Sequence, residues 1–125
     1  MLPPKTLGGP LGTRPMEGGG EVGMSAVETS LRGEIQVVLH KNMRTLWPRA
    51  ETPTHYMTMG LHEDLNQAAK IATREMLNFI VATKGMHRDD VLMLLSAAMD
   101  LHVTQIVDGT KGIHAMIPKN IFTRK

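Results

Sequence analysis

Residues 64–84 read DLNQAAKIATREMLNFIVATK and carry the most regular pattern in the chain. Small and apolar side chains recur there at steps of three and four residues, and Lys70, Arg74 and Asn78 are displaced from that stripe. Asp64 or His62 can cap the first turn, and a glycine follows the last residue, where the left-handed conformation costs glycine little. The stretch therefore predicts an amphipathic α-helix.

A second helix is predicted over residues 89–101. Asp89 and Asp90 fall in its first turn, where the helix dipole favours negative charge. From Val91 to Leu101 the sequence is mostly apolar and leaves almost no polar face. A domain of this size rarely covers such a helix on all sides. We therefore expect it to lie between layers of the fold, or to be covered by another domain or subunit.

Two strands are predicted before the helices. Residues 32–41 contain the β-branched, partly alternating run Gly33-Glu-Ile-Gln-Val-Val-Leu-His40, which favours a strand with one mostly covered face. A further strand is predicted over residues 54–59. Between them, Trp47-Pro48 and Thr52-Pro53 fix two φ angles and restrict the residues before them. This connection should be an extended, irregular loop and not a helix.

A β-hairpin is predicted after the helices. Its strands cover residues 103–108 and 113–117, a turn covers residues 108–112, and Pro118 ends it. Residues 1–23 are rich in glycine and proline, which predicts loop or disorder. The fold class is thus α+β: an N-terminal β segment from a partial β-rich domain, two helices at about 64–84 and 89–101, and a C-terminal hairpin, all within residues 24–125.

The composition excludes several classes of protein. With no cysteine, the chain forms no disulfide, thiolate nucleophile or thiolate metal site. Its charges are mixed in sign, without the basic stripe and interleaved aromatics of nucleic-acid binding. The longest nearly apolar stretch, residues 91–99, is far shorter than the roughly 20 residues of a membrane helix, and the N-terminus lacks the apolar core of a secretory signal. We expect a cytoplasmic protein with no nucleic-acid or membrane partner.

Glu21 is the first candidate catalytic residue. It follows three glycines, which let the backbone approach a ligand closely while the carboxylate projects from the turn. That arrangement suits a general base or an oxygen ligand. The alternative is an exposed acid in a linker. The chain contains no phosphate-binding loop, nucleophile elbow or zinc-protease motif.

Histidines and two further acids are weaker candidates. No two of the six histidines stand four residues apart, so their spacing supports no metal site, and His62 and His87 are typical of helix starts. His114 is either a half-buried strand residue bonded to backbone or a functional group. Asp108 precedes Gly109 and is typical of a turn. Glu51 lies in the proline-rich loop and can pair with Arg49.

Long motifs resemble the acetamidase/formamidase family. They begin with Gly20-Glu-Val-Gly and Val27-Glu-Thr, and continue with Trp47-Pro-Arg-Ala-Glu-Thr-Pro-Thr-His-Tyr and Met57-Thr-Met-Gly60. In the same order follow Ala98-Met-Asp-Leu-His-Val-Thr-Gln-Ile-Val-Asp108 and Gly112-Ile-His-Ala-Met-Ile-Pro-Lys119, which are similar to the family's C-terminal signature. The resemblance runs from about residue 17 to residue 122.

The resemblance implies hydrolysis of short linear amides, such as formamide and acetamide, to a carboxylate and ammonia. It also implies a β-rich homo-oligomer and a zinc or other divalent metal, as in relatives that act on cyclic amides. Family members are several times longer, so the chain corresponds to a C-terminal portion, a truncated or partial form. Before the glycine-rich turn they carry an Asp and a His that are absent from Leu11-Gly-Thr-Arg-Pro-Met-Glu-Gly-Gly-Gly-Glu21. Glu21 is kept, Gly19 replaces a second acid, and His102 stands where an arginine is usual.

Two functional hypotheses follow. In the first, the chain is an amide hydrolase of this type, with Glu21 as general base, unknown metal ligands, and a second copy or a complementing amidase chain as partner. In the second, it is a non-catalytic oligomerisation or assembly fragment, which its nearly all-apolar second helix favours. A truncated product with an exposed core would instead aggregate.

Overall fold

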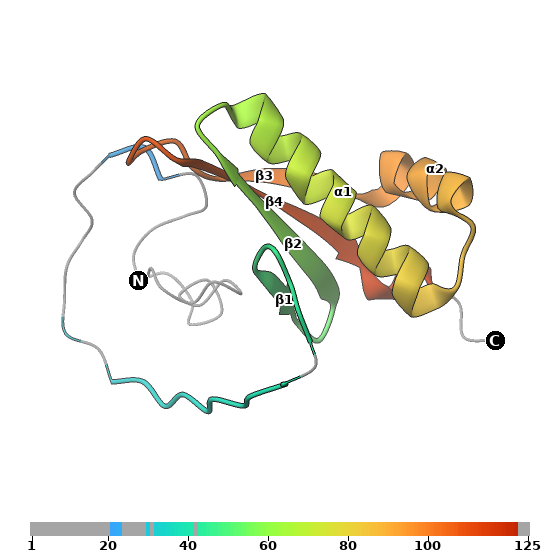
Figure 1. Cartoon of the computed structure of the whole chain (residues 1–125), viewed down its shortest axis with the longest axis horizontal. Helices are drawn as coiled ribbons and strands as arrows, with labels where there is room; N and C mark the ends of the chain where they lie inside the picture. The colour runs from blue at the N-terminus through green and yellow to red at the C-terminus, as the bar shows by residue number, and fades with distance from the viewer. Residues whose placement is uncertain (1–20, 24–29, 31, 42, 123–125) are drawn as a thin grey trace.

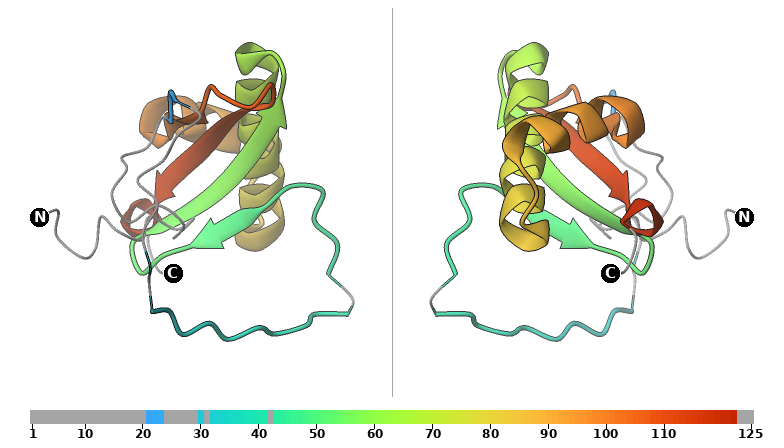
Figure 2. Two further views of the ribbon diagram at one scale, coloured as in Figure 1. Left: turned by 90° about the vertical axis from the view of Figure 1, so that its left-hand side faces the viewer. Right: turned by 90° about the vertical axis from the view of Figure 1, so that its right-hand side faces the viewer.

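The computed structural model describes residues 21–23, 30, 32–41 and 43–122. Within them, four antiparallel strands form one sheet in the order β1-β2-β4-β3. Helix α1 lies across this sheet, and α2 lies beside α1 (Figures 1 and 2). The elements in chain order are β1 Arg49–Glu51, β2 His55–His62, α1 Leu65–Lys84, α2 Arg88–Ala98, β3 Asp100–Gln105, β4 Lys111–Pro118 and the short 3-10 helix η2 Lys119–Ile121. The α+β prediction is confirmed.

Helix α1 begins and ends where its caps predict. Asp64 is the N-cap, and its Oδ1 accepts a hydrogen bond of 2.9 Å from the amide of Gln67. Gly85 adopts a φ of 64° and donates its N–H to the carbonyl of Val81. His62 supports the start, because its Nδ1 accepts from the amide of Asp64 at 2.9 Å.

The helix packs very close to the middle of β2. A Cβ added to Gly60 would lie 2.1 Å from the carbonyl oxygen of Ala68 and 2.6 Å from the amide nitrogen of Ala72. The buried Thr58 hydroxyl donates to the carbonyl of Ala72 at 2.8 Å, so it keeps a polar partner inside the interface. Small residues on both elements therefore set the spacing between helix and sheet.

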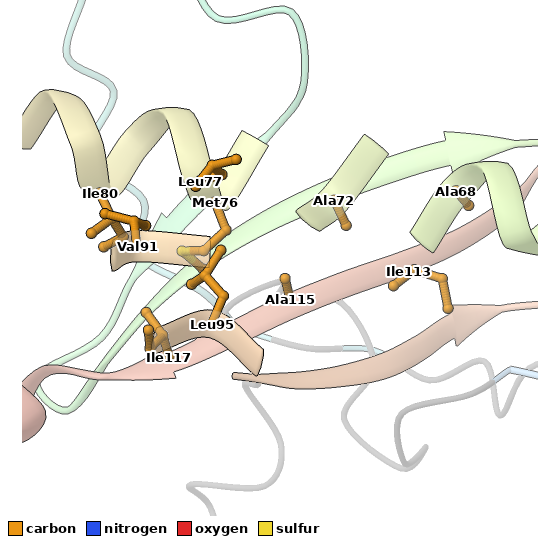
Figure 3. Packing of buried hydrophobic residues seen from close by; sticks show 10 residues of the cluster. All are labelled: Ala68, Ala72, Met76, Leu77, Ile80, Val91, Leu95, Ile113, Ala115 and Ile117. Carbon is orange, nitrogen blue, oxygen red and sulfur yellow. The ribbon is translucent and has the colours of Figure 1, made fainter. Parts of the chain in front are cut away.

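The core lies between the helices and the sheet and is almost free of aromatic rings. Figure 3 shows Met76, Leu95 and Ile117 meeting at one end, where the α2 residues close over the strand. Alanines 68 and 72 lie nearer Ile113 and Ala115, where the helix is closest to the sheet. The full cluster is Ala68, Ala72, Met76, Leu77, Ile80, Val91, Leu95, Ile113, Ala115 and Ile117.

Helix α2 is shorter than predicted. It ends at Ala98 with Met99 as C-cap, because Asp100 and Leu101 already pair with Met116 and Ala115 of β4. Only Val91 and Leu95 of this helix are buried, whereas Leu92 and Met93 are exposed. Within the described residues the helix is thus not enclosed between layers, and its cover by another domain or subunit stays a prediction.

The strand predicted over residues 32–41 is wrong for this structure. Those residues form no strand, and the segment runs as an extended, exposed trace away from the sheet (Figure 1). Ile35 is 86% exposed and Val37 is 88% exposed. Local β propensity is present, but a strand also needs a neighbour to bond with, and none of the described strands lies beside it.

The connection predicted as an irregular loop over residues 47–53 is also partly wrong. Its centre forms β1, which pairs with β2 through Arg49 and Thr58, Ala50 and Met57, and Glu51 and Tyr56. Pro48 lies just before the strand and Pro53 in the hairpin loop, so neither removes a ladder hydrogen bond. β1 is an edge strand, where such proline neighbours are tolerated.

The C-terminal hairpin is confirmed with shifted bounds. β3 covers residues 100–105 instead of 103–108, and its ladder with β4 is irregular between Val103 and Gln105. Pro118 is the last residue of β4. Most of the loop predicted for residues 1–23 falls outside the described residues. In the described part of the chain, no helix has the length and apolar content required to cross a bilayer.

Candidate functional site

Glu21 is held at the open edge of β3 by its backbone. Its amide donates to the carbonyl of Thr104 at 3.2 Å, and its carbonyl accepts from the amide of Ile106 at 2.9 Å. These two bonds make a parallel bridge opposite Gln105. The candidate base predicted from the glycine-rich turn is therefore fixed beside the C-terminal hairpin.

Thr104 connects this edge to His114. Its hydroxyl and the Nδ1 of His114 lie 2.8 Å apart and share a hydrogen bond. The His114 ring stacks on His102, with centroids 5.2 Å apart and an interplanar angle of 11°. His102 and His114 are direct partners in the β3–β4 ladder, so both rings lie on one face of the sheet.

That face is the one without helices. Ile113 and Ala115, the neighbours of His114 in β4, belong to the core cluster under α1, so His114 points the other way. Met57 and Met59 of β2 are opposite Met116 and His114 in the ladder and share this face. His114 thus stands among methionines, a second histidine and Thr104.

Burial and the neighbouring His102 both lower the pKa of His114 below its usual value, burial more strongly. A lowered pKa favours the neutral ring at pH 7, with one nitrogen a donor and the other an acceptor. Nδ1 is occupied by Thr104. A neutral imidazole can orient water or pass a proton.

The remaining predicted residues have structural positions. Asp108 has a φ of 67° and precedes Gly109 at 75°, so both form the left-handed turn of the hairpin, as expected for that position. Glu51 binds the amine of Lys119 and not Arg49, which instead forms a 2.8 Å ion pair with Glu75. Because β1 and β3 are opposite edges of the sheet, Glu51 is far from Glu21 in the strand order. His87 is the exposed N-cap of α2.

A cluster of cations and aromatic rings was missed by the sequence analysis. The amine of Lys84 lies 3.2 Å from the Tyr56 hydroxyl and 4.9 Å from the Phe122 ring centre. Lys119 lies 4.8 Å from the centre of the Tyr56 ring, which also meets Phe79 edge-on at 5.2 Å. The sequence has only two phenylalanines and one tyrosine, and all three rings belong to this cluster, packed against the core.

A groove of about 610 Å³ opens on the helical side. Its wall contains three cations, Lys70, Arg74 and Arg88, and the apolar side chains of Leu77 and Leu101. Glu21 and His114 do not line it. The groove can accept an anion, but it is separate from the β3 edge that holds the candidate base.

The described residues do not fit a resident metal ion. They contain no group of three or more histidine, aspartate or glutamate side chains placed to hold a metal. His102 and His114 supply two imidazoles, but their rings are stacked, and Nδ1 of His114 is bonded to Thr104. A structural or catalytic zinc requires three or four protein ligands.

Solved acetamidase structures are similar to this chain. The acetamidase of Yersinia enterocolitica matches 67% of the chain at 31% identity with a TM-score of 0.64, and the acetamidase of Bacillus halodurans matches 60% at 36% identity with a TM-score of 0.57. A predicted acetamidase/formamidase of Thermoanaerobacter tengcongensis matches 65% at 22% identity with a TM-score of 0.59, which shows a shared fold.

The chain spans about a quarter of the length of these structures, namely 26%, 25% and 27%. No family model matches the sequence, and no curated protein matches it.

Proposed function

Because this chain is a partial member of the acetamidase/formamidase family, we propose that it takes part in hydrolysis of short linear amides such as formamide and acetamide. The observation that carries the proposal is its similarity, at 31% and 36% identity, to two solved acetamidases. The products are a carboxylate and ammonia.

Glu21 is the proposed general base. Its backbone bonds to β3 hold the residue beside Thr104, and Thr104 in turn bonds His114. In the proposed reaction, the Glu21 carboxylate takes a proton from water as the water oxygen attacks the amide carbon. That proton then moves to the departing nitrogen as the C–N bond breaks.

His114 is the proposed positioning residue of this site. Its neutral ring keeps Nδ1 hydrogen-bonded to the Thr104 hydroxyl. This bond fixes the position of the ring relative to β3. A charged imidazolium would donate from both nitrogens, so its Nδ1 could no longer accept a hydrogen bond from the Thr104 hydroxyl.

The proposal includes a second polypeptide, either another copy or a complementing amidase chain. The chain spans about a quarter of the solved acetamidases, so most of their elements have no counterpart in it. Ligands for the zinc or other divalent metal expected in this family would come from that polypeptide or from residues outside the described ranges. We also propose a cytoplasmic location, which agrees with a chain that contains no cysteine.

The test is ammonia release from formamide and acetamide by the purified full chain, with and without added zinc. We expect release that Glu21→Gln lowers about 100-fold or more, the scale of a lost general base. Glu63→Gln, which changes an exposed acid just before α1 and outside the site, is the matched control and should leave the rate unchanged.

A folded chain that releases no ammonia from either amide under either condition would refute independent catalysis. The second candidate function, a non-catalytic assembly module, then remains. Its support is the exposure of Leu92, Met93 and Leu101 on α2 and the adjoining strand, since an apolar surface of this kind is typical of a contact with another chain.

A further inference from the structure

Two parts of the chain have backbone groups without a strand partner among the described residues. One is the segment Glu34–Leu39, which has the sequence of a strand but no strand partner among the described residues. The other is the outer side of β3, an edge strand whose start, Asp100–Val103, has no described neighbour on that side. We propose that residues 34–39 of one copy, the donor segment, add as a strand beside Asp100–Val103 of a second copy, the acceptor edge.

The donor segment has the side-chain pattern of an added strand. Ile35, Val37 and Leu39 alternate with Gln36 and Val38, so one face of the extended segment is wholly apolar. Those three side chains are 86%, 88% and 78% exposed. Backbone pairing with an open edge and burial of alternate side chains are the two sources of affinity in strand addition.

The acceptor edge offers an apolar surface at the same place. Leu101 is opposite Ala115 in the ladder and therefore lies on the helix-covered face, yet it stays 47% exposed. The preceding helix leads into β3 through Met99 alone and exposes Leu92 and Met93. A strand beside Leu101 would cover its exposed side chain.

Among the described residues, the open part of the β3 edge is short. From Thr104 to Ile106 the same side of β3 already bonds to Glu21. The added strand is therefore confined to Asp100–Val103, and the Glu21 contact stays in place.

Charge also favours this pairing. The donor segment lies between Arg32 and Lys41, a basic residue at each end, whereas the acceptor edge begins with the exposed Asp100. In an antiparallel pairing, the Lys41 end of the donor comes near Asp100, whereas a parallel pairing would bring Glu34 there. Opposite charges across neighbouring strands stabilise pairing and like charges oppose it, so the charges favour the antiparallel direction.

A second copy is the partner that satisfies both features at once. Every copy carries a donor segment and an acceptor edge, so two copies related by a twofold axis would exchange strands reciprocally. Within one copy, the chain around the donor is held at opposite edges of the sheet, by Glu21 at β3 and by Arg49 in β1. The segment bows away between these points, which presents it to another molecule (Figure 1).

The oligomeric state of the full chain gives the first test, by light scattering over a dilution series. We expect a dimer, and we expect Val37→Asp to raise its dissociation constant about tenfold or more, because an aspartate at the apolar face would be desolvated. Leu46→Asp is the matched control, since Leu46 is also 88% exposed but lies outside the donor segment. Circular dichroism of both variants checks that the fold is kept.

Cysteine crosslinking gives the second test, because the chain contains no cysteine of its own. One copy carries Val37→Cys with a size tag, and an untagged copy carries Leu101→Cys. We expect the mixed disulfide between them to form several times faster than the one from a Leu46→Cys copy.

Three results would overturn the proposal: a wild-type chain that stays monomeric, equal dissociation by Val37→Asp and Leu46→Asp, or a disulfide within single copies of a Val37→Cys, Leu101→Cys double variant. The last would mean that the segment docks on its own sheet. Neither test measures ammonia, so this proposal and the proposed hydrolysis succeed or fail separately.

Discussion

Gly60 is the residue where the fold tolerates least change. A methyl group there would overlap backbone atoms of Ala68 and Ala72, which cannot rotate away as a flexible side chain could. We predict that Gly60→Ala lowers the free energy of unfolding by about 3 kcal/mol, at the upper end of overpacking effects. Urea denaturation measures it. Gly33→Ala is the control, because nothing lies within 4 Å of its added Cβ; equal losses in both variants would contradict the close packing.

His114 should make stability depend on pH. Its folded pKa lies below the usual 6.5, so the folded state binds the proton less readily than the unfolded state. The contribution is fully present above pH 6.5 and is lost as the pH falls from there through the folded pKa. We predict that His114→Gln removes this part of the acid destabilisation.

The measurement is urea denaturation of wild type and variant at several values between pH 7.5 and pH 5. His40→Gln controls for loss of an exposed histidine. If the wild type and His114→Gln lose stability in parallel over this range, burial of His114 does not have the expected effect.

Some of the site could be predicted from single residues, and some could not. Glu21 stands out in the sequence because three glycines precede it, and Asp108 because Gly109 follows it. The link from Glu21 through Thr104 to His114 is invisible there, since it depends on which edge of the sheet lies open. The Glu51 prediction chose the nearest cation in sequence, whereas the strand order places Lys119 closer.

At the scale of elements, α1 was predicted almost to the residue. Its hydrogen bonds run between residues four apart, and both of its caps are adjacent to it in sequence. A local sequence therefore contains everything that this helix needs.

The N-cap of α1 provides a direct test of that local control. We predict that Asp64→Ala lowers the free energy of unfolding by about 1 kcal/mol, because the amide of Gln67 loses its acceptor. Thermal unfolding measures the change. Glu63→Ala, at the preceding exposed position, should have little effect; a larger loss there than at Asp64 would argue against the cap.

Strands were predicted less well for the opposite reason. Residues 32–41 have the composition of a strand yet pair with nothing described, while residues 49–51 looked like a loop and pair with β2. The predicted end of α2 was wrong for the same reason. The helix ends at Ala98 and not at Leu101, because Asp100 and Leu101 pair with β4. Whether a segment becomes a strand is decided by a distant neighbour.

At the scale of the whole molecule, large apolar side chains lie exposed in two of the described regions. They are Ile35, Val37, Val38, Leu39, Met43 and Leu46 in residues 32–46, and Leu92 and Met93 in α2. A chain that spans about a quarter of the solved acetamidases is expected to leave such surface for another polypeptide to cover.

By itself, the sequence determined the α+β class, the bounds of α1, the closing hairpin and the family resemblance, because each depends on contacts or motifs close together in the chain. Only the tertiary structure decided that Glu21 lies at the β3 edge beside Thr104, that His102 and His114 share the helix-free face, and that residues 34–39 have no strand partner among the described residues. Those facts follow from strand order and ladder register, which join residues far apart in sequence.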